Sequence, residues 1–222
     1  MALNKLKFNS LNVTPTAGKT IGFNSSADGL EATLSGGAMT FIKKLTADED
    51  STVDFVDGSS SVVLDSTYKE YIFFFKDIHP SAGAYFTFQG NAAGGSGFNE
   101  TMTTTFFYGY HAEGGGSGTL MYNNGADQAQ GTGYQYIAAD GTNNDADGAL
   151  VGYLHLFNPS STTFVKHFVS RISNPNGAGS STYQCDCYTA GYFYTTSAID
   201  EISFKFTSGN IDAGTITLYG IN

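Results

Sequence analysis

The hexapeptide NNDADG, which begins at Asn143, has the residue types and spacing of a calcium loop. Asn143, Asp145 and Asp147 alternate as oxygen ligands do in such loops, and Gly148 falls where the chain must turn tightly. The twelfth position, which an EF-hand fills with a bidentate glutamate, is Leu154. The segment is therefore a candidate metal site with one ligand missing. The alternative is a solvated polar turn, and no cofactor is predicted.

Cys185 and Cys187 lie two residues apart, so on a strand their side chains point to the same side. A disulfide between them would be strained at that spacing. A metal site needs about four ligands, and no CxxC pattern or histidine pair stands nearby to supply them. We expect both cysteines to be buried packing residues.

The sequence contains none of the common catalytic motifs: there is no GxSxG, no HExxH and no phosphate loop. The histidines His155 and His167 are expected to face each other across a hairpin, as core or interface residues. The acidic residues cluster in turns, where charges are solvated. Any two acids that meet in space can still form a glycosidase pair. We predict that the chain is not an enzyme.

Five tyrosines stand beside loops rich in Asn, Asp and Gln, which is a combination suited to sugar rings. An aromatic face packs against the ring of a sugar, and amides bond its hydroxyl groups. The absence of tryptophan argues against this hypothesis. The candidate glycan contacts are Tyr108, Tyr110, Tyr122, Tyr134 and Tyr136.

The composition predicts the kind of element that must position these residues. Glycine (28), phenylalanine (18) and tyrosine (14) are abundant, and charged residues make up only 14% of the 222 residues. Apolar residues keep a helical spacing nowhere for more than about two turns. We therefore predict an all-β protein: an antiparallel two-sheet β-sandwich, jelly-roll-like, of roughly a dozen strands.

Residues 1–66 are predicted to be N-terminal strands or an arm of the same domain, and residues 67–222 the core of the sandwich. The alternative for the first 37 residues is an arm that orders only on a neighbour. Residues 68–78 (YKEYIFFFKDI) carry aromatics on both sides, which predicts a central strand covered above and below.

Several local patterns predict particular connections. Asp57-Gly58 predicts a hairpin between residues 53–56 and 61–64, and residues 158–160 a hairpin between strands 150–157 and 164–172. Residues 120–133 are interpreted as a loop with one helical turn. Gly191 is predicted to be a β-bulge in the strand 183–194.

The C-terminal segment alternates most regularly. Ile202, Phe204 and Phe206 share one face of an extended chain, and Ile216 and Leu218 repeat the pattern after a polar, glycine-containing turn. Period-two alternation on both sides of a turn predicts an antiparallel hairpin over residues 199–221 with one buried face.

The net charge of −10 excludes some classes of function. An acidic surface repels phosphate backbones, so nucleic-acid binding is not expected. No apolar run approaches the roughly 20 residues of a membrane span, and the N-terminal residues show no signal-peptide core, so neither membrane insertion nor export by a cleaved signal is expected.

Three segments resemble a known family: KEYIFFFKDIHPSAGAYFTFQG (69–90), LHLFNPSSTTFVKHF (154–168) and the C-terminal stretch that starts with TAGYFYTTSAID. Over residues 68–221 the chain is similar to short virion structural proteins encoded by tailed phages of marine bacteria, including cyanobacteria. The resemblance implies a virion structural protein, made in the host cytoplasm and built on a jelly-roll-like sandwich. It carries no catalytic motif to positions of this chain.

The leading hypothesis is a non-enzymatic virion component, exposed on the particle as a tail, fibre or baseplate-associated protein. Its expected partners are other virion proteins and, at the host surface, a glycan. One alternative is a capsid decoration or head-fibre protein, and another is a carbohydrate-binding module. Because the edges of a sandwich must be covered, we expect a symmetric homo-oligomer, with a trimer favoured.

Overall fold

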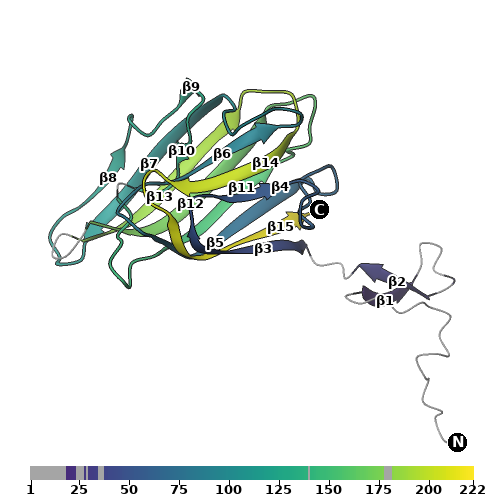
Figure 1. Cartoon of the computed structure of the whole chain (residues 1–222), viewed down its shortest axis with the longest axis horizontal. Coiled ribbons are helices and arrows are strands. Elements are labelled where there is room, and N and C mark those ends of the chain that lie inside the picture. Colours follow the sequence, from purple (N-terminus) through teal and green to yellow (C-terminus); the bar gives the residue numbers. More distant parts are fainter. Residues whose placement is uncertain (1–18, 24–27, 29, 35–37, 140, 178–181) are drawn as a thin grey trace, which may run out of the picture. The chain divides into compact units, whose positions relative to one another are not determined.

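The computed structural model describes residues 19–23, 28, 30–34, 38–139, 141–177 and 182–222, and within these residues all regular elements are strands (Figure 1). The chain divides into two units, residues 1–38 and 39–222. In the first unit β1 (Lys19–Phe23) pairs antiparallel with β2 (Leu30–Leu34). Residues 1–18, 24–27, 29 and 35–37 of the predicted arm lie outside the described residues. Residues 39–66 belong to the second unit.

The second unit contains a large antiparallel sheet with the strand order β3-β15-β5-β11-β12-β13-β7-β8, and β9 pairs with β7 beside β8. In the described part of the chain this sheet has nine strands. Their bounds are β3 (Met39–Asp50), β5 (Glu70–Pro80), β7 (Met102–Ala112), β8 (Gly118–Tyr122), β9 (Ala129–Gly131), β11 (Leu150–Phe157), β12 (Lys166–Asn176), β13 (Tyr183–Phe193) and β15 (Ile211–Ile221).

A smaller antiparallel sheet has the order β10-β6-β14-β4 and packs against one face of the large sheet. Its strands are β4 (Val53–Val56), β6 (Phe86–Ala92), β10 (Gln135–Tyr136) and β14 (Ile199–Phe206). The chain passes repeatedly from one sheet to the other, as in β3-β4-β5-β6, while β11, β12 and β13 follow one another within the large sheet. The predicted antiparallel two-sheet β-sandwich is confirmed.

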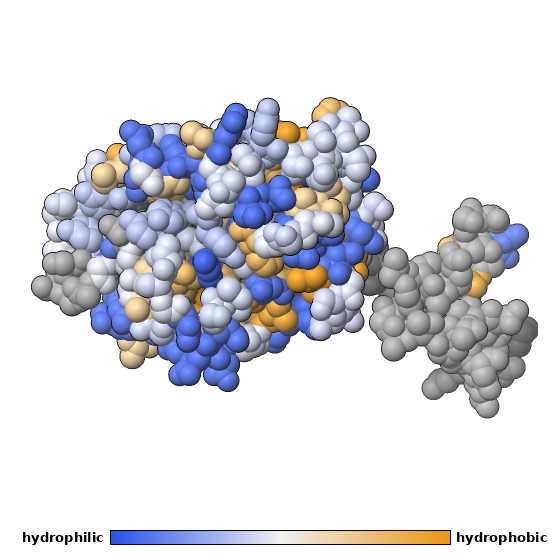
Figure 2. Space-filling model, turned by 45° about the horizontal axis from the view of Figure 1, so that its top comes forward, coloured by the Kyte–Doolittle hydropathy of each residue, from blue (hydrophilic) through white to orange (hydrophobic). Residues whose placement is uncertain are grey.

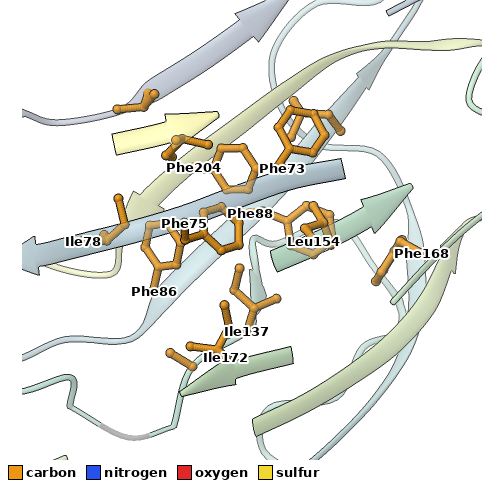
Figure 3. Close-up of a cluster of buried hydrophobic side chains, with 14 of the residues drawn as sticks. Phe73, Phe75, Ile78, Phe86, Phe88, Ile137, Leu154, Phe168, Ile172 and Phe204 are labelled. Carbon is orange, nitrogen blue, oxygen red and sulfur yellow. The ribbon is translucent and has the colours of Figure 1, made fainter. Parts of the chain in front are cut away.

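The core lies between the sheets and is dominated by phenylalanine (Figure 3). Phe73 and Phe75 of β5 point inward and meet Phe204 of β14, with ring centroids 5.3 and 5.1 Å apart. Phe86 and Phe88 of β6 complete the contact from the small sheet. Each such ring contributes roughly 1.5–3 kcal/mol by leaving water. Period-two alternation in strands from both sheets therefore produces one shared core.

The C-terminal segment is not a hairpin. β14 pairs with β4 and β6 in the small sheet, whereas β15 pairs with β3 and β5 in the large one. The turn between them crosses the sandwich. The five apolar residues predicted to share a buried face are all buried, but they approach the core from opposite sheets. Alternation marks which side chains are buried, and it does not determine which strands pair.

Other local predictions were wrong. Residues 61–64 follow β4 without forming a strand, and residues 120–133 contain β8 and β9 with no helical turn. The register of β13 is continuous at Gly191, so no bulge lies there. A side chain at Gly191 would have its Cβ 2.6 Å from the carbonyl oxygen of Thr103 and 2.9 Å from the ring of Phe168. Close packing, and not a bulge, requires this glycine.

The hairpin of β11 and β12 is confirmed, but its two histidines do not face each other. His155 lies opposite Val169, and His167 lies opposite Tyr192 of β13. His155 instead contacts Glu70, with Nε2 2.8 Å from Oε2. Both histidines lie on the face of the large sheet that points away from the core.

Candidate interaction surface

The face of the large sheet opposite the core, called the outer face below, carries a row of aromatic residues that crosses the strands. The strand register aligns Phe74 (β5), Tyr153 (β11), Arg171 (β12), Tyr188 (β13) and Phe107 (β7) side by side. Tyr122 on β8 extends the row at one end, and Thr217 and Lys44 extend it at the other. The prediction that β5 is covered on both sides is wrong for the described residues, because Phe74 is 37% exposed.

The rings of this row contact one another. Phe107 stacks on Tyr188 with centroids 5.0 Å apart and an interplanar angle of 5°. The Arg171 guanidinium lies 5.2 Å from the centroid of Tyr188. Phe74 meets Tyr153 edge to face at 6.4 Å. Such contacts contribute about 0.5–1.5 kcal/mol beyond burial and hold the rings in a fixed surface.

A second row on the same face lies two residues further along each of the central strands. It includes Phe41 (β3), Tyr219 (β15), Ile72 (β5) and Val169 (β12). Phe41 is 58% exposed and Val169 39%, and the ring of Phe41 packs edge to face on Tyr219 at 5.9 Å. The outer face therefore exposes aromatic and aliphatic side chains across the width of the sheet.

Two pairs of polar side chains lie on this face. Arg171 donates to both carboxylate oxygens of Asp186, at 2.9 and 2.8 Å. The hydrogen bond to Arg171 is the largest cause that holds the pKa of Asp186 below its ordinary value. Glu70 faces His155 in the second pair. Arg171 and Asp186 balance each other's charge at the centre of the face, in a chain whose net charge is −10.

Apolar side chains gather on the surface of the second unit: Figure 2 shows apolar patches among hydrophilic residues on the side turned to the viewer. Single exposed apolar residues are ordinary in proteins, but contiguous patches mark interaction sites. The two rows on the outer face differ from single exposed residues because their members are neighbours in the strand register of one sheet. Sequence reasoning missed the outer face because the apolar run of β5 was interpreted as buried on both sides.

The structure divides the five tyrosines predicted to bind glycans into separate places. Tyr108 and Tyr110 of β7 line a cavity of about 270 Å³ together with Tyr183, a residue that the sequence did not single out. The other lining residues are Met121, Asn176 and Cys185.

Tyr134 and Tyr136 line a second, more polar cavity of about 210 Å³ beside Asp127. The hydroxyl of Tyr134 donates to Ser203 at 3.1 Å, and the Lys205 ammonium lies 4.1 Å from the centroid of its ring. Tyr122, 56% exposed, donates its hydroxyl to Asp127, which raises the pKa of this tyrosine. Tyr134 and Tyr122 therefore already make polar contacts with other residues of the chain.

The three residues predicted as calcium ligands lie in the loop before β11. Asn143 accepts a hydrogen bond from the backbone N–H of Asp145 at 2.6 Å and donates its amide to the carboxylate of Asp145 at 3.0 Å. Asp147 is exposed. A Cβ at Gly148 would lie 2.7 Å from the carbonyl oxygen of Asn143, so the turn needs glycine. The contacts are those of a self-bonded polar turn.

The two cysteines are free and buried on the inner face of β13. Burial raises the pKa of Cys185 to about 11 and that of Cys187 further. The backbone N–H of Ala139 lies 3.1 Å from the sulfur of Cys187, whose thiol donates to Asn174 at 3.3 Å. Within the described residues, no group of three or more His, Cys, Asp or Glu side chains is arranged to hold a metal ion.

No helix in the part of the chain that the structure describes has the length and apolar character to cross a membrane. Comparison of the chain with protein-family models, with curated proteins and with solved structures finds no match.

Proposed function

We propose that this chain is a non-enzymatic structural protein of a tailed-phage virion, exposed on the particle as a tail, fibre or baseplate-associated component. In this proposal the outer face of the large sheet packs against other subunits in a symmetric homo-oligomer, with a trimer favoured. The observation that carries the proposal is the pair of aromatic rows on that face. Aromatic residues with few unpaired charges are typical of the buried centre of protein interfaces.

The size of the outer face supports this assignment. From β3 to β8 the sheet spans seven strand spacings, roughly 34 Å at about 4.8 Å each. An 11-residue strand such as β12 is roughly 37 Å long. The available face therefore exceeds the ~800 Å² per partner that a stable interface buries.

Charge also favours contact through this face. Copies that each carry −10 repel one another wherever acidic loops meet. On the outer face the charge of Arg171 is balanced by Asp186, and the carboxylate of Glu70 lies 2.8 Å from Nε2 of His155. Two copies can therefore approach there with little repulsion, while Lys44 and Lys76 at the β3 side attract acidic groups of a neighbour.

Sedimentation velocity of the full chain at micromolar concentration tests the assembly. We expect an oligomer for the natural sequence, and dissociation for Phe74→Glu and Tyr153→Glu, because each places an unpaired charge in the contact. Ser59→Glu is the control, since Ser59 is exposed in the turn that follows β4 of the small sheet, and this sheet packs on the opposite face of the large one. A natural chain that stays monomeric at about 100 µM, far above the Kd of a stable assembly, would contradict the proposed interface.

Location in the particle tests the virion role separately. Immunogold labelling of purified particles should mark the tail, its fibres or the baseplate. Label on the head would favour the capsid decoration or head-fibre alternative instead. Absence of the chain from purified particles would refute a virion role and leave the carbohydrate-binding module as the remaining hypothesis.

A further inference from the structure

We infer that the cavity lined by Tyr108, Tyr110, Met121, Asn176, Tyr183 and Cys185 binds one neutral sugar residue, such as the end of a surface glycan. This site lies on the inner face of the large sheet, so it is independent of the outer face and of assembly. Three features indicate the kind of ligand: tyrosine side chains line the cavity, their rings contact one another, and none of the lining residues is charged.

The cavity exists because the inner face extends beyond the residues that cover it. Along β7 the inward residues Met102, Thr104 and Phe106 are buried, but the next two, Tyr108 and Tyr110, are only half-buried. β13 shows the same change from the buried Cys187 and Cys185 to the half-buried Tyr183. Where the core ends, tyrosine takes the inward positions, with an apolar ring and a polar hydroxyl group.

The tyrosine rings are fixed by one another and by the strand register. Tyr110 meets Tyr183 at 5.3 Å and 88°, which forms a right-angled corner. Tyr108 lies 6.2 Å from Tyr110 on the other side, and its hydroxyl lies 3.6 Å from the sulfur of Met121. A site whose walls are already in place loses little conformational entropy when a ligand binds.

Cys185, a small side chain among the three tyrosines, forms the floor of the cavity. Cys185 lies opposite Tyr110 on β7 and opposite Asn174 on β12, and it is 1% exposed. Asn176, the neighbour of Tyr183 in the register, hydrogen-bonds the Cys185 side chain. A longer residue at Cys185 would project into the cavity, so the space depends on this position.

The lining selects a neutral, hydroxyl-rich ligand. None of the lining residues carries a charge, and the chain as a whole repels anions because its net charge is −10. A cation would find no carboxylate among the lining residues. A pyranose offers an apolar ring face to a tyrosine and hydroxyl groups to the tyrosine oxygens and to Asn176. The volume of about 270 Å³ lies just below the usual range of roughly 300–1,000 Å³ for small-ligand sites, which suits one sugar unit.

Saturation-transfer NMR and calorimetry on the full chain test the inference with glucose, galactose, mannose and N-acetylglucosamine, each at up to 20 mM, which is roughly twenty times a Kd of 1 mM. We expect at least one to bind with a millimolar Kd. Tyr183→Ala and Tyr110→Ala should each weaken binding at least tenfold. Cys185→Met should block it by filling the floor while all three tyrosines remain.

Tyr194→Ala is the matched control, because Tyr194 is 56% exposed and lies outside the cavity. It should bind sugar as the natural chain does. Circular dichroism and thermal melting establish that each variant is folded, and if Cys185→Met fails that check the two tyrosine variants decide. Failure of all four neutral sugars to bind, unchanged binding in the folded tyrosine variants, or preference for an apolar probe such as indole or for sialic acid would each overturn the inference.

Discussion

The two faces of β5 carry the same residue type in different surroundings. Phe73 and Phe75 point to the inner face and are 0% and 3% exposed, whereas Phe74, between them, is 37% exposed on the outer face. The small sheet covers Phe73 and Phe75, whereas no described sheet packs over Phe74 on the outer face. Burial is therefore set by what lies opposite a side chain, and not by its own hydrophobicity. A phenylalanine left on a sheet face by its own chain is available to a partner.

The most severe test of this comparison is removal of the last eight residues, 215–222. They form most of β15, which pairs with both β3 and β5 and supplies Ile216 and Leu218 to the core. Deletion should expose two strand edges and leave no folded, soluble protein. Soluble yield and far-ultraviolet circular dichroism measure this. If the shortened chain stays soluble and melts near the temperature of the natural one, β15 is peripheral to the fold.

The next test compares neighbouring rings directly. Phe73→Ala should lower the free energy of unfolding by roughly 3–5 kcal/mol, because it opens a cavity in the core. Phe74→Ala should cost only about 1 kcal/mol, the centre of the range for point substitutions, because it opens no cavity in the core. Urea denaturation at one fixed protein concentration measures both, since assembly also contributes to apparent stability. Equal losses for the two variants would mean that the outer face is covered as completely as the inner one.

A smaller effect is expected from the sulfur atoms of the inner face. The double variant Cys185→Ala, Cys187→Ala should cost on the order of 1–3 kcal/mol of stability and leave the fold intact, because both thiols act as packing groups. Thermal melting and elemental analysis check this together. Loss of a stoichiometric metal in the double variant would show that the thiols are ligands.

The smallest effect is expected on the outer face itself, from Arg171→Ala. The pKa of Asp186 is lowered in the folded chain, so its pair with Arg171 stabilises the protein above the unfolded pKa of about 3.9. That contribution is lost as the pH falls through the lower, folded pKa. Both side chains are about half exposed, so solvent screens the pair and the change is slight. Melting from pH 7 to pH 2 should show the natural and variant chains converge in acid. A constant difference would assign the effect to packing.

The candidate sites show the same division between what residue types indicate and what the fold arranges. Tyr108 and Tyr110, two residues apart on one strand, were predicted as glycan contacts and do line one cavity. Tyr183, more than 70 residues further along the chain, completes it, and nothing in the local sequence connects the three. Tyr134 and Tyr136 were chosen on the same grounds but line a different cavity.

The sequence alone establishes the all-β class and, for the alternating C-terminal strands, which side chains are buried. Alternation is local, because successive side chains of an extended chain point to opposite sides wherever that chain lies. It correctly predicted the burial of Phe204, Phe206, Ile216 and Leu218. Tertiary contacts assign β14 and β15 to opposite sheets, and they bring a second sheet against one face of β5 while no described sheet covers the other. Strand pairing and cover depend on contacts between residues far apart in the chain, and a local pattern fits many such arrangements equally well.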